Sequence, residues 1–340
     1  MVGRRGTPLP GSGARQRRVT VVMYHFVRNL RYSRYPAIKG LDTVDFAGQL
    51  EYIRKHYNVV RMQDVIAAAQ DPAAELPERA LLLTFDDGYA DHYQNVFPVL
   101  DEFDLPGAFF PPARAVLERR VLDVNKIHFL LAAVSDTRRI VAALETRIEA
   151  SRGTHVLKPL AEYRETYAHG NRWDNAETIY IKRLLQKGLP GDLRSRILGE
   201  LFAEFVSADE QAFAEELYVS VPQLRCMLRH GMHVGSHGHE HVWLDSLPPS
   251  AQELEIHRSL QFLEAIGCDS DEWVMCYPYG GVNQSLLDIL AENRCRVGLT
   301  TELGIADLNT SSPLLLARID TNDLPTSPNA RPNAWTRAAA

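Results

Sequence analysis

Short apolar runs alternate with longer amphipathic segments along most of the 340-residue chain. The amphipathic segments repeat apolar residues at helical spacing, as Phe46, Leu50 and Ile53 do within residues 45–57. The apolar runs have the length of single strands, and they predict strands at residues 19–25, 58–62, 80–85, 107–111, 233–236, 273–277, 297–300 and 314–318. Strands that alternate with helices are typical of βα units around a parallel sheet or barrel. We therefore expect an α/β fold.

The alternation fails in one long stretch, residues 117–228. Helical spacing there predicts several consecutive helices, including residues 136–150, 177–187 and 192–206. We interpret the stretch as a helical insertion. It divides the βα scaffold into a first part, residues 19–116, and a second part, residues 229–323.

The two ends of the chain lack the apolar runs of the scaffold. Residues 1–18 are rich in glycine, proline and arginine, and residues 324–340 contain Pro325, Pro328 and Pro332. Segments of this kind bury too little apolar surface to offset the entropy lost on ordering. We expect both ends to be disordered tails.

Composition and charge narrow the class of protein. Apolar residues make up 45% of the chain and charged residues 24%, as in ordinary globular proteins. The formal net charge is -6, and the five arginines within residues 1–18 contribute +5, so that the rest of the chain carries -11. An acidic body of this kind argues against nucleic acid as the main partner.

Apolar patterning and cysteine usage bear on location. The apolar run at residues 19–27 is interrupted by Tyr24 and His25, and we expect neither a secretory signal nor a transmembrane segment. No CxxC spacing occurs among the four cysteines, Cys226, Cys268, Cys276 and Cys295. We expect reduced thiols in a cytoplasmic protein.

The first candidate for chemistry is the motif Thr-Phe-Asp-Asp-Gly at residues 84–88, directly after an apolar strand. Two adjacent carboxylates at the mouth of a buried strand repel each other unless a cation or a proton relieves them. The structural alternative is a helix cap with a turn at Gly88. The motif marks Asp86 and Asp87 as candidate site residues.

The second candidate is Gly-Ser-His-Gly-His-Glu-His at residues 235–241, again after a short apolar strand. Neutral imidazoles of His237 and His241, with one carboxylate from Asp86 or Asp87, would form a site with open positions for water. Zn²⁺ suits this ligand set, as do other divalent metals. A histidine-rich surface turn is the alternative, but the carboxyl ends of parallel strands meet on one face, which favours a site.

Three further groups stand at predicted strand ends. In Tyr277-Pro278-Tyr279-Gly280 the backbone N–H of Tyr279 can face an oxyanion, although most such tetrapeptides are simple turns. His25 is a candidate proton donor, with a structural histidine as its alternative. Arg318 can pair with a carboxylate, with a surface ion pair as its alternative.

With these motifs the sequence resembles the polysaccharide deacetylase family, the NodB-homology proteins of carbohydrate esterase family 4. The resemblance runs from residue 19 to about residue 323, interrupted by the insertion. His237-Gly-His-Glu-His241 fits the family's His-(Ser/Thr)-x-x-His motif, with Gly238 in place of Ser or Thr, and Tyr277-Pro278-Tyr279-Gly280 fits its Pro-Tyr motif. The implied fold is a distorted (β/α)₇ barrel.

The resemblance also implies roles for single residues. Asp87, His237 and His241 would bind a divalent metal, most simply Zn²⁺, and Asp86 would be the catalytic base. The turn at Tyr277, Pro278 and Tyr279 would bind substrate, with Tyr279 also acting in catalysis.

Two departures from the family pattern set up a hypothesis. Cys276 stands where many relatives carry an arginine, and no histidine follows His257, so the family's Leu-x-His acid is missing. We hypothesise that Arg318 reaches across to orient Asp86. His25, or a group outside the metal ligands, would then donate the proton.

The implied activity is metal-dependent removal of an N-acetyl group from an amino sugar in a saccharide or glycoconjugate intermediate. A cytoplasmic enzyme would act on a small, lipid-linked or nucleotide-linked carbohydrate. The basic, aromatic loop at residues 31–39 is a candidate to stack on a sugar or bind a diphosphate, and equally a solvated loop. The insertion fits a lid over the substrate or the interface of a homo-oligomer.

Four other functions fit the same residues. A sugar deformylase or a cyclic-amide hydrolase would use the same site on another amide. The product distinguishes a deformylase, which releases formate, from a deacetylase, which releases acetate. A non-catalytic carbohydrate-binding protein would have lost its acid, although the retained Asp86, Asp87, His237 and His241 argue against it. A structural metal protein would close the site with a fourth ligand such as His239.

Overall fold

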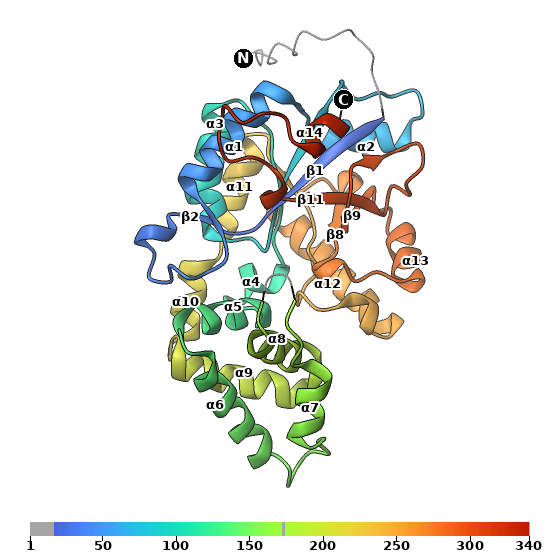
Figure 1. Cartoon of the computed structure of the whole chain (residues 1–340). Helices are drawn as coiled ribbons and strands as arrows, with labels where there is room; N and C mark the ends of the chain where they lie inside the picture. Colours follow the sequence, from blue (N-terminus) through green and yellow to red (C-terminus); the bar gives the residue numbers. More distant parts are fainter. Residues whose placement is uncertain (1–16, 172–173, 340) are drawn as a thin grey trace. The chain divides into compact units, whose positions relative to one another are not determined.

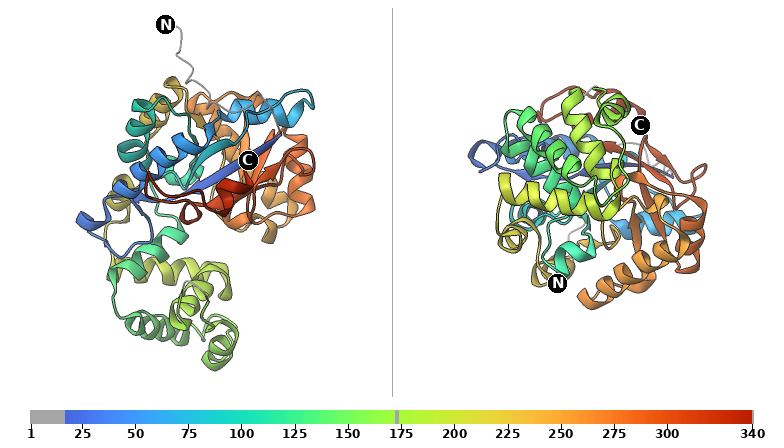
Figure 2. Two further views of the ribbon diagram at one scale, coloured as in Figure 1. Left: turned by 45° about the horizontal axis from the view of Figure 1, so that its top comes forward. Right: turned by 90° about the horizontal axis from the view of Figure 1, so that it is seen from below.

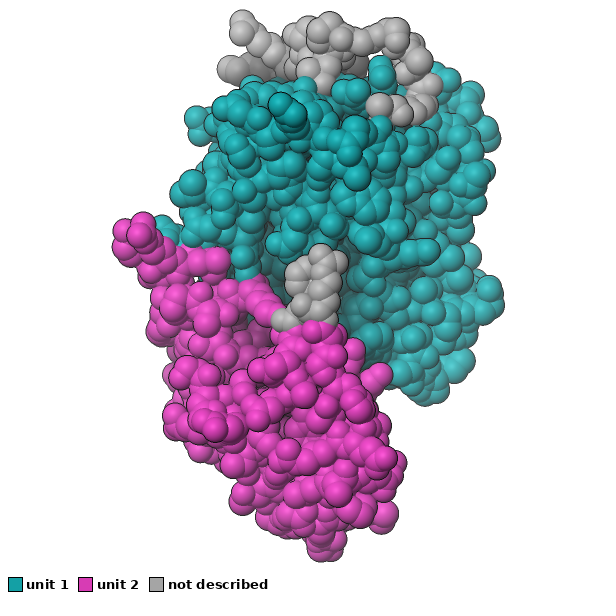
Figure 3. All heavy atoms as spheres, viewed as in Figure 1, with its two compact units in different colours: residues 1–29, 40–119, 217–340 teal, residues 30–39, 120–216 magenta. Residues whose placement is uncertain are grey.

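The computed structural model describes residues 17–171 and 174–339, which form two compact units. The first, here called the barrel unit, comprises the described residues up to 29, residues 40–119 and the residues from 217 onward (Figure 3). The second, here called the helical unit, comprises residues 30–39 and 120–216. Residues 1–16 of the expected basic tail lie outside the described residues. Arg17 is described, and its guanidinium donates to the carbonyl of Asp71 at 2.7 Å.

The barrel unit is built on one sheet in the strand order β7-β6-β5-β1-β11-β9-β8. These strands are β7 (His233–Val234), β6 (Ala108–Phe110), β5 (Ala80–Asp86), β1 (Arg18–Tyr24), β11 (Leu316–Asp320), β9 (Val297–Leu303) and β8 (Val274–Cys276). All pair in parallel, with β4 (Asn58–Val59) beside β5, while β10 (Ala306–Asp307) runs antiparallel to β1. Each segment predicted to hold a strand contains one.

A parallel bridge between Ser236 and Met275 joins the two outer strands of this order. The amide of Ser236 donates to the carbonyl of Val274 at 2.9 Å, and the amide of Cys276 donates to the carbonyl of Ser236 at 2.8 Å. The ring is thereby closed. The expected distorted (β/α)₇ barrel is confirmed.

Helices surround the strands of the barrel unit (Figures 1 and 2). They are α1 (Thr43–His56), α2 (Met62–Gln70), α3 (Phe97–Glu102), α4 (Ala113–Leu117), α11 (Val221–Arg229), α12 (Pro249–Ile266), α13 (Gln284–Glu292) and α14 (Ala334–Ala338). Two short strands, β2 (Val27–Arg28) and β3 (Leu41–Asp42), pair outside the barrel. In the described part of the chain, no helix is long and apolar enough to cross a membrane.

Strand periodicity explains why the barrel has an apolar interior and polar side chains at its mouth, where the carboxyl ends of the strands lie. Every residue of β5 is buried, because the barrel interior covers one face and the helices cover the other. Leu82 joins a cluster inside the barrel, whereas Leu81 and Leu83 join a cluster that includes the outer helices. Side chains alternate along a strand, so Thr84 and Asp86 continue the inward row that Leu82 begins. Asp86 thus lies at the barrel mouth above an apolar interior.

The C-terminal segment differs from the expected disordered tail. Residues 324–339 lie against α1, and the Nζ of Lys55 donates to the carbonyl of Pro328 at 2.9 Å. The segment ends in α14, where the buried hydroxyl of Thr336 contacts the phenols of Tyr52 and Tyr57 at 2.7 and 3.0 Å. Polar contacts of this kind can order a segment that lacks an apolar run. Composition does not show such contacts, and the prediction of a disordered tail was wrong for this reason.

The helical unit has a core of its own. Its helices are α5 (Asp123–Ala133), α6 (Thr137–Ala150), α7 (Leu160–Tyr167), α8 (Ala176–Arg183), α9 (Gly191–Phe205) and α10 (Glu210–Leu217). Buried apolar residues from five of them, including Leu130, Leu144, Ile181 and Leu198, form one cluster. The helical insertion is therefore an independently packed body.

The boundaries of this unit differ from the expected 117–228. Residues 217–228 belong to the barrel unit, because Leu224 and Met227 of α11 pack in the cluster around its strands. The loop at residues 30–39 belongs to the helical unit instead. Its Tyr35 ring meets the edge of Phe129 at 5.0 Å, and the Nζ of Lys39 lies 2.7 Å from Oδ1 of Asp174.

Candidate active site

The two carboxylates of the Thr-Phe-Asp-Asp-Gly motif diverge because the chain turns sharply after β5. Asp86 is the last residue of the strand, and Asp87 and Gly88 follow with φ values of 71° and 65°. A Cβ atom at Gly88 would lie 2.6 Å from the Cβ of Pro111, so the turn requires glycine at this position. The left-handed turn points Asp87 away from the inward row of β5, and each carboxylate acquires its own neighbours.

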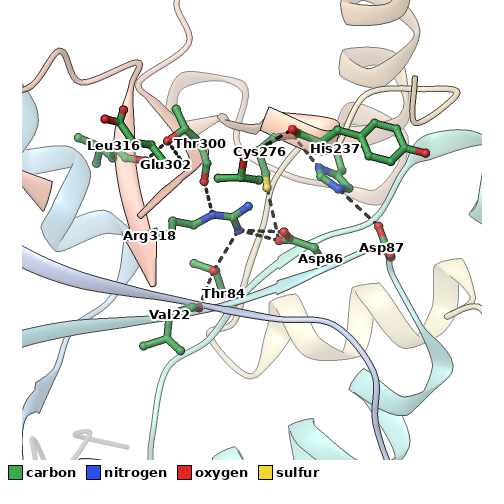
Figure 4. A network of polar contacts seen from close by, with 12 residues as sticks. Val22, Thr84, Asp86, Asp87, His237, Cys276, Thr300, Glu302, Leu316 and Arg318 are labelled. Carbon is green, nitrogen blue, oxygen red and sulfur yellow. Dashed lines mark hydrogen bonds and ion pairs between the residues drawn. The ribbon is translucent and has the colours of Figure 1, made fainter. Parts of the chain in front are cut away.

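Asp87 lies with His237 and His241 in one buried cluster. Its Oδ1 is 3.1 Å from Nε2 of His241 and 3.5 Å from Nε2 of His237. The Nδ1 atom of His237 lies 2.7 Å from the carbonyl of Cys276, which turns Nε2 toward Asp87 (Figure 4). A carbonyl behind a ligating imidazole fixes its orientation in metal sites.

This donor set fits a divalent metal ion. The ligand atoms of Asp87, His237 and His241 all lie within 4.8 Å of one another. Oδ1 of Asp87 is buried and accepts no hydrogen bond from the described residues, as expected for an atom that needs a cation. Two imidazoles and one carboxylate leave coordination positions open, which is typical of catalytic zinc sites.

Electrostatics keeps the carboxylate of this cluster ionised. Burial opposes ionisation of Asp87, but attraction from His241 and the close approach of both imidazoles outweigh it, and the pKa of Asp87 lies well below its usual value. Metal binding requires a deprotonated carboxylate, so this ligand is ready at neutral pH.

Asp86 is paired with Arg318, as hypothesised from the sequence. Nη1 of Arg318 lies 2.9 Å from Oδ2 and 3.1 Å from Oδ1 of Asp86. The guanidinium is only 2% exposed, and its Nε donates to the carbonyl of Thr300 at 2.7 Å (Figure 4). Nη1 also reaches the hydroxyl of Thr84 at 3.4 Å. Arg318 therefore crosses from β11 to β5 in a fixed position.

This pairing determines the charge of Asp86. Burial opposes ionisation, but Arg318, followed by His237 and His25, holds the pKa of Asp86 below its usual value. The thiol of Cys276 donates to Oδ1 of Asp86 at 3.4 Å. Asp86, His237 and Cys276 form a second group of potential ligands, but Arg318 already neutralises this carboxylate. The chemistry of the donors therefore favours Asp87 over Asp86 as the ligand.

The loop that carries the two histidines is held by a residue that sequence reasoning did not single out. Glu255 of α12 is buried, and its Oε2 accepts the amides of His239 and Glu240 at 2.9 and 3.0 Å. Burial raises the pKa of Glu255. Glu255 lies in the amphipathic helix that follows the loop, and nothing in the local sequence distinguishes it from a solvent-facing glutamate.

The turn after β8 places its two tyrosines on opposite sides. Tyr277 is fully buried in the outer core, and its phenol donates to the carbonyl of Leu314 at 2.8 Å. The predicted contact of Tyr277 with substrate does not fit this placement, because strand alternation turns it outward where Cys276 turns inward. Pro278 is also buried, within the turn itself.

Tyr279 instead lies beside the histidine cluster. It adopts a left-handed φ of 58°, and its ring meets His241 edge-on at 4.8 Å. The half-buried Trp243 stacks on the same ring at 4.8 Å with an interplanar angle of 6°. Trp243 is a second residue that sequence reasoning did not select, although it follows His241 by two positions.

The remaining candidates occupy different positions around the cluster. His25 is half-buried at the end of β1, near enough to lower the pKa of both Asp86 and Asp87. Its carbonyl lies 2.9 Å from Nε2 of His92. His239 faces away from Asp87, with Nε2 3.7 Å from carboxylate oxygens of Glu118 and Glu240. This placement does not fit a metal site closed by His239.

The sequence matches curated N-deacetylases from two Escherichia coli strains over a short segment. A stretch of 36 residues, 11% of this chain, is 53% identical to poly-beta-1,6-N-acetyl-D-glucosamine N-deacetylase of Escherichia coli (strain K12). The match spans only 5% of that protein's length.

Several solved structures are similar over nearly the whole chain, among them the following two. The Streptococcus pyogenes deacetylase PplD, in complex with acetate, has a TM-score of 0.55 at 19% identity, covering 92% of this chain and 95% of PplD. IcaB from Ammonifex degensii has a TM-score of 0.52 at 20% identity, covering 96% of this chain and 97% of IcaB. At these identities the likeness shows a shared fold.

The family model for polysaccharide deacetylases matches residues 73–147 and 205–298. The matched segments contain β5 with Asp86 and Asp87, the loop with His237 and His241, and the turn at Tyr279. The unmatched stretch between them lies within the helical unit. Together with the closed barrel and the geometry at its mouth, this match establishes that the chain belongs to the polysaccharide deacetylase family.

Proposed function

We propose that the protein is a metal-dependent hydrolase that removes N-acetyl groups from amino sugars of a saccharide. The observation that carries the proposal is the juxtaposition of two differently paired carboxylates. Asp87 faces two imidazoles, and Asp86 faces a guanidinium. The names of the relatives, an N-acetyl-D-glucosamine N-deacetylase and a deacetylase bound to acetate, support the same reaction.

Asp87, His237 and His241 would hold the divalent ion, and Zn²⁺ suits their donor atoms. When bound, such an ion supplies Lewis acidity that polarises the acyl carbonyl and lowers the pKa of water. The protein contributes a ligand set whose orientation is fixed in advance, because His237 is held by the carbonyl of Cys276 and the histidine loop is held by Glu255.

Asp86 acts as the general base. Its ionised carboxylate removes a proton from the attacking water, whose oxygen forms the new bond to the acyl carbon. Arg318 keeps Asp86 ionised before the reaction and orients it. Arg318 is itself always protonated, so it does not compete for the proton.

Two groups complete the reaction. The backbone N–H of Tyr279 donates a hydrogen bond to the oxyanion that develops on the acyl oxygen. His25, which follows β1 and stands beside the end of β5, donates a proton to the nitrogen as the carbon–nitrogen bond breaks. The products are a free amino sugar and acetate.

Product analysis tests this function and separates it from its alternatives. The protein reconstituted with Zn²⁺ is incubated with N-acetylated and N-formylated glucosamine oligomers, free, lipid-linked and nucleotide-linked, and acetate and formate are quantified. We expect acetate release that a chelator abolishes and Zn²⁺ restores. Formate release alone would identify a deformylase. If the protein with bound metal releases neither acetate nor formate from any of these substrates, the result would favour a non-catalytic carbohydrate-binding protein.

We infer a cytoplasmic location, in which the substrate is a saccharide or glycoconjugate intermediate rather than a cell-wall polymer. The support is the state of Cys226, Cys268, Cys276 and Cys295, which are all free thiols. Fractionation of cells that express the full-length protein tests this location. Recovery of the protein with the soluble cytoplasmic fraction is expected, and recovery outside the cytoplasm would contradict it.

A further inference from the structure

The two oxygens of the Asp87 carboxylate have different neighbours. Oδ1 faces the Nε2 atoms of His237 and His241 and accepts no hydrogen bond from the described residues. Oδ2 accepts a hydrogen bond from the phenol of Tyr89, with 2.5 Å between the two oxygens. A phenol donor thus occupies one oxygen and leaves the other directed at the imidazoles.

Tyr89 is held rigidly enough to define this geometry. Its side chain is fully buried, and its ring stacks on Phe26 with centroids 3.7 Å apart and an interplanar angle of 19°. The edge of the ring faces His92 at 5.6 Å. The backbone of Tyr89 forms an antiparallel bridge with Tyr218. Neither the ring nor the backbone is free to swing away from Asp87.

The Phe26 ring also contacts a residue of an ion pair. The guanidinium of Arg28 lies 4.5 Å from the centre of the Phe26 ring. Arg28 binds both oxygens of Asp91, with Nε–Oδ2 at 2.8 Å and Nη2–Oδ1 at 3.1 Å. A bidentate pair fixes the guanidinium, which in turn limits movement of the Phe26 ring.

We propose that Tyr89 is a positioning residue for the metal site, which selects the rotamer of Asp87 and reserves Oδ1 for the ion. The proposal rests on the proposed function, since it concerns the same ligand set. Its physical basis is that a carboxylate held by a donor through one oxygen loses less conformational freedom when the other oxygen binds. Tyr89 acts through Asp87 and does not touch substrate.

The test compares Tyr89→Phe with wild type and with a matched control, Tyr24→Phe. Tyr24 is also a fully buried phenol of the barrel unit, but it donates to Gln49 instead of a metal ligand. Both substitutions remove one buried hydroxyl, so both carry a similar stability cost. Zn²⁺ affinity is measured by competition with a chromophoric chelator, and Co²⁺ absorption reports the ligand geometry.

We expect Tyr89→Phe to bind Zn²⁺ roughly ten- to a hundred-fold more weakly than wild type and to alter the Co²⁺ spectrum. Tyr24→Phe should bind within about two-fold of wild type. Equal affinity in Tyr89→Phe and wild type would overturn the proposal while leaving the metal site intact. Failure of wild type to bind any divalent ion would instead overturn the proposed function.

A second variant covers the case in which Tyr89→Phe does not fold by circular dichroism. Phe26→Leu keeps the phenol but removes the ring on which it stacks. We expect a several-fold loss of Zn²⁺ affinity in this variant as well, because the phenol is less firmly held. Unchanged affinity in folded Phe26→Leu would contradict the rigid clamp that the proposal requires.

Discussion

At the scale of single residues, the proposed mechanism depends on an ion pair inside the barrel. Asp86 and Arg318 are 1% and 2% exposed, so neither charge can be solvated without the other. Removing one member of a buried pair leaves an uncompensated charge and typically costs about 3–5 kcal/mol. The same removal changes the protonation of the partner that remains.

Replacing Arg318 with methionine should therefore affect both stability and pH dependence. Arg318 is the largest favourable influence on ionisation of Asp86, so its loss leaves burial to raise the pKa of that carboxyl. The base would then be protonated at a higher pH, and the acidic limb of the kcat/KM profile should move upward. Urea unfolding should show a loss of about 3–5 kcal/mol.

Arg318→Lys serves as the control for this prediction. It retains a positive charge but lacks the planar fork that reaches Asp86, Thr84 and Thr300 together. We expect a smaller shift of the acidic limb than in Arg318→Met. An Arg318→Met enzyme with an unshifted profile would show that Arg318 does not control the ionisation of Asp86.

A second prediction at this scale concerns His233, which lies in β7 outside the histidine cluster. Burial lowers the pKa of His233 from 6.5 to about 4. The unfolded chain therefore binds a proton between pH 6.5 and 4 that the folded chain does not, and stability falls as the pH falls through this window. The contribution amounts to about 2 kcal/mol between pH 7 and pH 5.

Denaturant unfolding at pH 7 and pH 5 tests this sign. His233→Leu should lose about 2 kcal/mol less than wild type over that interval. His257→Gln, a change at an exposed position of α12, should lose as much as wild type. Identical pH dependence in His233→Leu and wild type would contradict the assignment of a neutral, buried imidazole.

At the scale of secondary-structure elements, strand ends position the carboxylates and a helix positions the histidines. Alternation along β5 turns Asp86 inward, and the left-handed turn at Asp87 and Gly88 directs the second carboxylate elsewhere. The histidine loop also contains left-handed residues, Gly238 and His241. Such a loop requires external support, which comes from Glu255 on α12.

Substitutions at Glu255 should separate the role of its charge from that of its oxygen. A glutamine retains an amide oxygen that can accept both backbone N–H groups, and burial already disfavours the charged form of Glu255. An alanine leaves two backbone donors without their acceptor, one buried and one partly buried, at up to about 1–3 kcal/mol for each. We expect Glu255→Gln to bind Zn²⁺ nearly as wild type does, and Glu255→Ala to bind it several-fold more weakly.

Isothermal calorimetry with Zn²⁺ on both variants checks this expectation, with thermal unfolding as a companion measurement. If Glu255→Ala binds as tightly as wild type, the loop does not depend on α12. If Glu255→Gln is as impaired as Glu255→Ala, the negative charge itself matters.

At the scale of the whole molecule, the sequence predicted the barrel well because its strands are buried on both faces. Continuous apolar runs such as that of β5 can be recognised from the local sequence. Because the strands form a closed parallel ring, the motifs that follow them all lie at the same end of the barrel. The pairing of Arg318 with Asp86 followed from the same logic, since both stand at strand ends on one face. What depended only on strand order could be predicted.

Contacts between segments distant in sequence could not be predicted in this way. The support of the histidine loop by Glu255 and the order of the C-terminal segment rest on hydrogen bonds between different elements. The contact of Tyr89 with Asp87 joins residues only two positions apart, but it depends on the left-handed turn at Asp87 and Gly88, which the sequence alone does not show. The loop at residues 30–39 joins the helical unit through Tyr35 and Lys39, although it is far from that unit in sequence. Side-chain alternation also explains why Tyr277 does not face the site as predicted. Cys276, the last residue of β8, points into the barrel, so the next residue, Tyr277, points outward.

The central claim, that Asp87 binds the metal and Asp86 is the base, is tested most directly by measuring Zn²⁺ content and acetate release together in wild type, Asp86→Asn and Asp87→Asn. Asp86→Asn should retain Zn²⁺ and lose acetate release by roughly 10²-fold or more, because the base alone is removed. Asp87→Asn should lose both Zn²⁺ and activity. Full acetate release by Asp86→Asn, or wild-type Zn²⁺ affinity in Asp87→Asn, would contradict this account.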